Sequence, residues 1–112
     1  MKSMKMNNAE KKDTPHKVDV RTLSDTEHAQ IVHIMLKPGE SLKRHVTPVD
    51  AAFYVLEGTP TIEIADEKEV HGKDTLIESP ARIIHTILNE SKSIARVLVI
   101  KTPRPKEATK VL

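Results

Sequence analysis

The chain has 112 residues, no cysteine and a formal net charge of +2. The absence of cysteine excludes disulfides, thiolate metal sites and cysteine nucleophiles. The length suits one domain with one core, and no apolar run reaches the ~18 residues of a membrane-spanning helix. Because the first 17 residues are polar and lack the apolar run of a signal peptide, we expect a cytoplasmic protein without a membrane partner.

The basic residues are concentrated at the two ends of the chain. Between residues 18 and 100, nine Lys and Arg stand against thirteen Asp and Glu, so this body is acidic. Only Phe53 and Tyr54 are aromatic, too few for a platform that stacks single-stranded bases. We therefore expect no nucleic-acid partner.

Three segments differ in composition. Residues 1–17 have low hydrophobicity and mixed charge, which is typical of a disordered tail. Residues 18–101 hold the short apolar runs expected of a folded domain. Pro103 and Pro105 interrupt regular strand pairing, so residues 102–112 are expected to form a second tail.

The central segment divides into short runs rich in β-branched residues and separated by turn residues, which predicts an all-β single domain. The predicted strands are Val18–Leu23, Gln30–Leu36, Ser41–Val46, Ala52–Leu56, Thr61–Ala65, Lys68–Val70, Thr75–Glu78, Ile83–Leu88 and Ile94–Lys101. One segment is ambiguous, because Asp25–Leu36 also fits a helical stripe. The alternation ending at Pro38-Gly39 favours a strand from about Gln30.

Two stretches carry regularly spaced glycine, histidine and proline residues. The first places residues in the order Gly39, His45, Thr47, Ala51 and Gly58, with gaps of five, one, three and six residues, and includes the phrase Phe53-Tyr54-Val55-Leu56-Glu57-Gly58. The second places Pro80, Arg82, His85 and Asn89 in a similar pattern. Together they resemble the two motifs of the cupin family, over about residues 31 to 100.

This resemblance implies a double-stranded β-helix, a cupin jelly-roll barrel, and a homodimer. In the family, three histidines and one glutamate bind a divalent metal in the barrel, which suits Fe, Mn, Ni, Cu or Zn. Carried over by position, His45 and His85 are two of the metal ligands. Thr47 and Ala51 stand where the other two ligands are expected, so half of the set is absent, and whether a metal binds at all is left open.

A third ligand could come from Asp50 or His33. In a regular strand Asp50 faces away from His45, although a β-bulge can re-aim such a side chain. His33 faces the cavity if Ile31 and Met35 form the inner row, and faces away if Val32, Ile34 and Leu36 form it. The sequence allows both arrangements.

The preferred hypothesis is a small-molecule-binding cupin with a degenerate metal site in the barrel cavity. Strand parity around the two histidines predicts the lining of this pocket: His45, Thr47, Phe53, Val55, Ile83 and His85. One alternative is a metal-dependent oxygenase or isomerase that uses His45, His85 and a recruited third ligand. Another is a dimeric scaffold or interaction protein. The sequence identifies neither a small-molecule ligand nor a catalytic residue, and it leaves open whether the protein is an enzyme.

Overall fold

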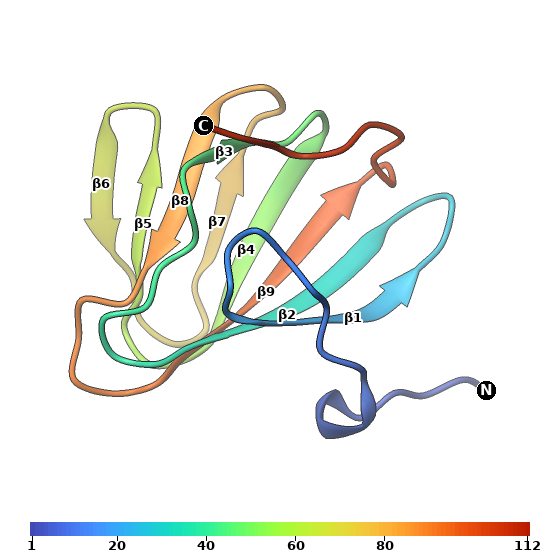
Figure 1. Cartoon of the computed structure of the whole chain (residues 1–112), viewed down its shortest axis with the longest axis horizontal. Helices are drawn as coiled ribbons and strands as arrows, with labels where there is room; N and C mark the ends of the chain where they lie inside the picture. The colour runs from blue at the N-terminus through green and yellow to red at the C-terminus, as the bar shows by residue number, and fades with distance from the viewer.

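Two antiparallel sheets of five strands each form the computed structural model, which describes residues 1–112. The elements are η1, a 3-10 turn (Met6–Asn8), β1 (Asp19–Asp25), β2 (Gln30–Leu36), β3 (His45–Val46), β4 (Asp50–Glu57), β5 (Thr61–Ile64), β6 (Glu67–Val70), β7 (Leu76–Ser79), β8 (Ile84–Leu88), β9 (Ala95–Thr102) and β10 (Lys110–Val111). The first sheet has the order β1-β2-β9-β4-β7 and the second the order β10-β3-β8-β5-β6 (Figure 1). No helix has the length and apolar character needed to cross a membrane.

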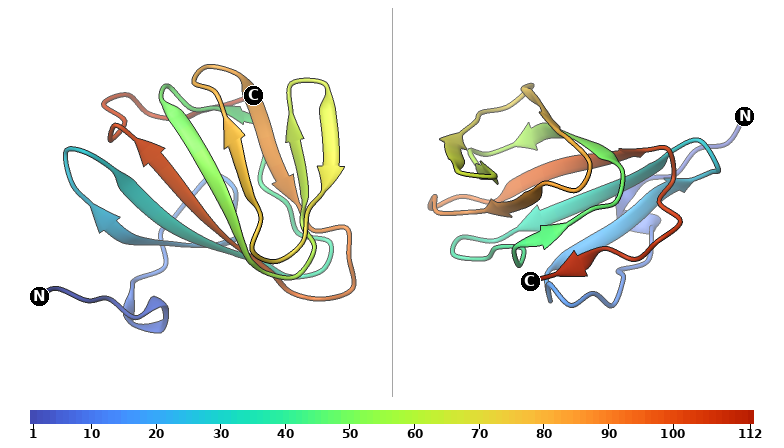
Figure 2. Two further views of the ribbon diagram at one scale, coloured as in Figure 1. Left: turned by 180° about the vertical axis from the view of Figure 1, so that it is seen from behind. Right: turned by 90° about the horizontal axis from the view of Figure 1, so that it is seen from above.

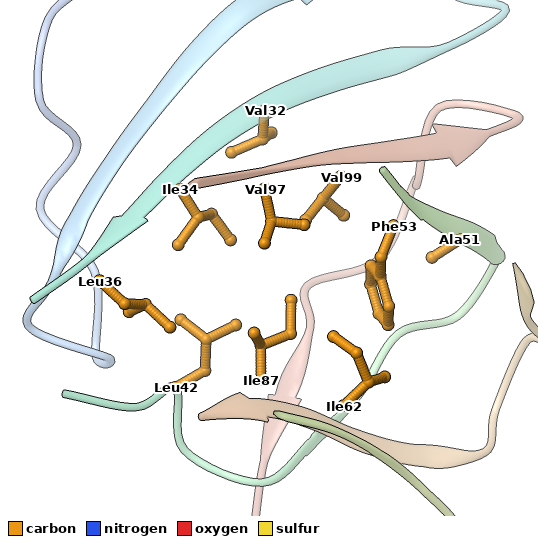
Figure 3. Close-up of a cluster of buried hydrophobic side chains, with 10 residues drawn as sticks. All are labelled: Val32, Ile34, Leu36, Leu42, Ala51, Phe53, Ile62, Ile87, Val97 and Val99. Carbon is orange, nitrogen blue, oxygen red and sulfur yellow. The ribbon is translucent and has the colours of Figure 1, made fainter. Parts of the chain in front are cut away.

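The two sheets face each other (Figure 2), and they share one hydrophobic core. Apolar side chains from both sheets point toward one another (Figure 3). The members of this cluster are Val32, Ile34, Leu36, Leu42, Ala51, Phe53, Ile62, Ile87, Val97 and Val99. Burying one face of each sheet against the other is the favourable arrangement for alternating strands. The predicted all-β barrel with a single domain is therefore confirmed.

The ambiguous segment before Pro38 is a strand, as the alternation favours. β2 pairs with β1 on one side and with β9 on the other, so it is a central strand. Val32, Ile34 and Leu36 face the core, which places His33 on the outer surface of the sheet. Strand pairing on both sides outweighs the helical periodicity, because each backbone group then has a ladder partner.

The predicted strand over Ser41–Val46 is shorter in the structure. Only His45 and Val46 form β3, while Ser41 makes an isolated bridge to Leu88. Leu42 is buried, and its N–H donates to the carbonyl of Ile87. This stretch therefore contributes a core side chain without continuous pairing.

The two ends of the chain lie against the barrel, where composition predicted tails. The guanidinium of Arg21 donates hydrogen bonds to three carbonyls within residues 6–9, which holds the N-terminal segment against the outer face of the first sheet. At the other end, β10 pairs with β3 and extends the second sheet. Each end of the chain contacts a segment that is distant in sequence, so the composition of the two ends does not predict these contacts.

Candidate functional site

A cavity of about 310 Å³ lies between the two sheets, beside the apolar core. Its position follows from the inward-facing rows of the strands. Along β9, Ala95, Val97 and Val99 are buried apolar residues, and the next inward position is Lys101. The inward row of β2 similarly runs from Leu36 to Gln30, which also lines the cavity. The barrel is therefore filled by apolar side chains at one end and lined by polar and apolar side chains together at the other.

His45 and His85 lie side by side in this cavity. They are directly opposite each other in the β3–β8 register, and their ring centroids are 4.5 Å apart. Directly opposed residues in an antiparallel pair project to the same face. The two motif histidines, 40 positions apart in the chain, thus share one cavity.

The ring of His85 is held by two hydroxyl groups. Ser79 Oγ lies 2.7 Å from its Nδ1 and Thr47 Oγ1 lies 3.1 Å from its Nε2. A neutral imidazole has one N–H and one lone pair, so one hydroxyl accepts and the other donates. His85 also packs edge-on against Phe53 and is only 2% exposed. Both ring nitrogens are therefore occupied, and the ring orientation is fixed.

The backbone of Lys43 sets the tautomers of two other imidazoles. Its carbonyl lies 2.6 Å from His45 Nδ1, which must carry a proton because a carbonyl only accepts. Its N–H donates to His16 Nδ1 over 2.9 Å, so that atom carries a lone pair. In the neutral rings, His45 therefore has its lone pair at Nε2 and His16 has its proton at Nε2.

Burial keeps these imidazoles neutral. Desolvation, together with the neighbouring His45, Lys101 and His16, lowers the pKa of His85 to about 3. Desolvation, together with the neighbouring His45, Lys101 and Lys43, lowers the pKa of His16 to about 4. Desolvation also lowers the pKa of His45, while the hydrogen bond to Lys43 opposes that shift. A charged imidazolium is disfavoured here because it would lose water without gaining a carboxylate.

The predicted pocket is brought together in part. Thr47 and Phe53 line the cavity with the two histidines. Val55 faces inward but is completely buried and does not reach the cavity wall. The prediction for Ile83 is wrong, because this residue is 38% exposed and lies in the turn before β8. Arg82 has a left-handed backbone, with φ of 65°, which breaks the alternation from which Ile83 was placed.

Neither candidate third ligand joins the histidine pair. The carboxylate of Asp50 accepts a hydrogen bond from the Ala81 N–H at the exposed start of β4. His33 lies on the outer surface of the first sheet, where its Nε2 accepts a hydrogen bond from Arg96 Nε. The β4 backbone is regular at Asp50, so no bulge turns its carboxylate inward.

The residues present do not fit a resident transition metal. Such an ion needs four or more ligands, and the structure contains no group of three or more His, Cys, Asp or Glu side chains arranged to hold one. Of the two motif histidines, His85 has both nitrogens in hydrogen bonds, and only His45 offers a free lone pair. Lys101 adds a positive charge to the same cavity, which further opposes a cation.

Among the residues that the sequence did not place at the site, three lie near the histidine pair: Lys101, Ser79 and His16. Parity could have identified Lys101 as the next inward position after Val99, and likewise Ser79 at the end of β7. His16 had no such indication, because it lies outside the strands and reaches the cavity only through the fold of the N-terminal segment. Its ring centroid is 4.8 Å from that of His45.

Comparison with known proteins agrees with this architecture. Residues 32–101 match the cupin domain family. The chain is 31% identical to an uncharacterised protein of Methanocaldococcus jannaschii over 98 residues, 87% of this chain and 84% of the relative.

Two solved structures are also similar. The crystal structure of an RmlC-like cupin with a double-stranded β-helix fold, from the same organism, matches with a TM-score of 0.76 and 27% identity, over 88% of this chain and 91% of the other. A Thermus thermophilus protein matches with a TM-score of 0.80 and 27% identity, over 94% of this chain and all of the other. With the family match spanning both motif histidines and a shared barrel architecture, the chain belongs to the cupin domain family.

Proposed function

We propose that this protein binds a small organic molecule in the cavity between its two sheets. The observation that carries the proposal is a preformed cavity of about 310 Å³ whose wall combines apolar and polar side chains. Small-molecule sites also combine apolar walls with polar groups that fix the orientation of the ligand, and they begin at roughly 300 Å³. An apolar cavity of about 150 Å³ already accommodates benzene, so the space suits a single ring with substituents.

The polar groups are organised before any ligand arrives. Ser79 and Thr47 hold the His85 ring, and the Lys43 carbonyl holds the His45 ring with its Nε2 free to accept a hydrogen bond. Fixed side chains lose little conformational entropy on binding, which favours affinity. The cavity is thus better suited to orienting a ligand than a collection of mobile surface side chains would be.

A metal-dependent oxygenase or isomerase has less support. That chemistry needs at least three protein ligands and open positions on the ion, whereas the donor set described above supplies one free imidazole lone pair. No observation favours a scaffold role over ligand binding. The homodimer and the cytoplasmic location remain predictions.

Ligand binding can be tested with three aromatic probes of similar shape: benzoate, benzamide and benzamidine. We expect at least one to shift backbone amide resonances of cavity residues in two-dimensional NMR titrations. Thr22 lines the cavity from β1, so Thr22→Phe should fill the space and abolish those shifts. Ser24→Phe adds the same ring at an exposed position of the same strand and should leave binding intact. If no probe binds, or if Thr22→Phe binds as wild type does, the proposal is wrong.

A further inference from the structure

The cavity has an unbalanced charge. Its wall contains three histidines and one lysine, and it contains no Asp or Glu. The histidines are His16, His45 and His85, whose pKa values are all lowered by burial. At neutral pH the only formal charge among the lining side chains is therefore the ammonium group of Lys101.

Lys101 has no acidic partner. It occupies the inward row of β9, and its register partners on the neighbouring strands are Gln30 and Ala51. None of the ion pairs in the structure includes it. The nearby Asp50 accepts its hydrogen bond from a backbone N–H. The ammonium is also partly buried, and desolvation lowers its pKa.

An unpaired, partly desolvated ammonium is unfavourable unless something compensates it. An anion bound beside it would supply this compensation through a charge-assisted hydrogen bond. A single lysine without a neighbouring arginine matches one negative charge better than the two of a phosphate. The remaining wall includes Val32, Ile34, Phe53 and Val99, which suits an apolar group attached to the anion.

Building on the binding function proposed above, we infer that the ligand is a small organic monocarboxylate with a compact apolar body. Its carboxylate pairs with Lys101, and its apolar body lies against the valine, isoleucine and phenylalanine side chains of the wall. The free Nε2 of His45 accepts a hydrogen bond from a donor on the ligand, where the ligand has one. This assigns Lys101, outside both cupin motifs, as the residue that selects the charge of the ligand.

The same three probes test this inference, because they differ mainly in charge. Benzoate is an anion, benzamide is neutral and benzamidine is a cation. We expect benzoate to bind wild-type protein about tenfold more tightly than benzamide, the factor that corresponds to one charge-assisted hydrogen bond in a partly buried site. Benzamidine should bind most weakly, because it meets a like charge.

Lys101→Met keeps the length of the side chain and removes its charge. It should bring the affinity for benzoate down to that for benzamide while leaving benzamide binding unchanged. Lys92→Met is the matched control, because Lys92 is exposed in the β8–β9 connection and carries the same charge; this variant should keep the preference for benzoate.

The outcomes separate the two proposals. Equal binding of benzoate and benzamide to wild-type protein, or an unchanged preference in Lys101→Met, overturns the inference about charge and leaves cavity binding standing. Failure of all three probes to bind overturns the binding function itself. Because the comparison of probes uses wild-type protein, the inference stays testable even if Lys101→Met does not fold.

Discussion

Lowering the pH from about 7.5 to about 5 is expected to destabilise the fold through the buried imidazoles. His85 shows the reason most clearly, since burial lowers its pKa to about 3 in the folded protein. In the unfolded chain its pKa returns to about 6.5. Between these two values the unfolded state binds more protons than the folded state, so the free energy of unfolding falls as the pH falls.

The size of the effect follows from the two pKa values. Near pH 5 the unfolded His85 is almost fully protonated and the folded one almost fully neutral, so this residue alone removes about 2 kcal/mol relative to pH 7.5. For a domain of this length, that corresponds to a decrease of roughly 8 °C in the midpoint of thermal unfolding. His16, with its pKa lowered to about 4, adds a smaller amount because its partial exposure weakens the effect.

Urea denaturation followed by circular dichroism at several pH values between about 5 and 7.5 measures this dependence, in a window that lies above most carboxylate titration. His85→Gln keeps a polar side chain near Ser79 and Thr47 but cannot titrate, so its stability should depend less steeply on pH. His28→Gln removes an imidazole from an exposed turn and serves as the control. The reasoning is refuted if His85→Gln loses as much stability as wild type over this window.

Three further predictions concern single features of the fold. Asn89→Ala should lower the free energy of unfolding, measured by urea denaturation, by about 2–4 kcal/mol, because the buried Asn89 amide donates to the carbonyls of Leu36 and Ser93. A loss below about 1 kcal/mol would contradict this structural role of Asn89. Gly58→Ala should lower the free energy of unfolding by about 2 kcal/mol or more, because Gly58 has a φ of 79° and a Cβ there would collide with the carbonyl oxygen of Ile94. Unchanged thermal stability of this variant would refute the prediction. Added Zn²⁺ should not raise the unfolding midpoint in differential scanning calorimetry, whereas a resident site would stabilise the fold by about 2.7 kcal/mol at a hundredfold excess over Kd.

Local patterns in the sequence determined the strands and the two motifs. Alternation and turn residues are properties of neighbouring positions, so β2 and β8 could be placed within a residue or two of their observed bounds. The resemblance to the two cupin motifs then paired His45 with His85, and the structure places them directly opposite each other in the β3–β8 register. Alternation failed only where the backbone leaves the strand, as it does at Arg82.

Only the tertiary structure decided what surrounds the histidine pair. His16 is held at the cavity by a hydrogen bond from the backbone N–H of Lys43, 27 residues away in the chain. At the end of the chain, β10 pairs with β3. Burial, which makes the imidazoles neutral and leaves Lys101 as the lone charge, likewise depends on every segment that covers them. The residues in such contacts have no fixed separation in the chain, so no local pattern of residues predicts them. A strand can be predicted locally because every second residue along it faces the same side.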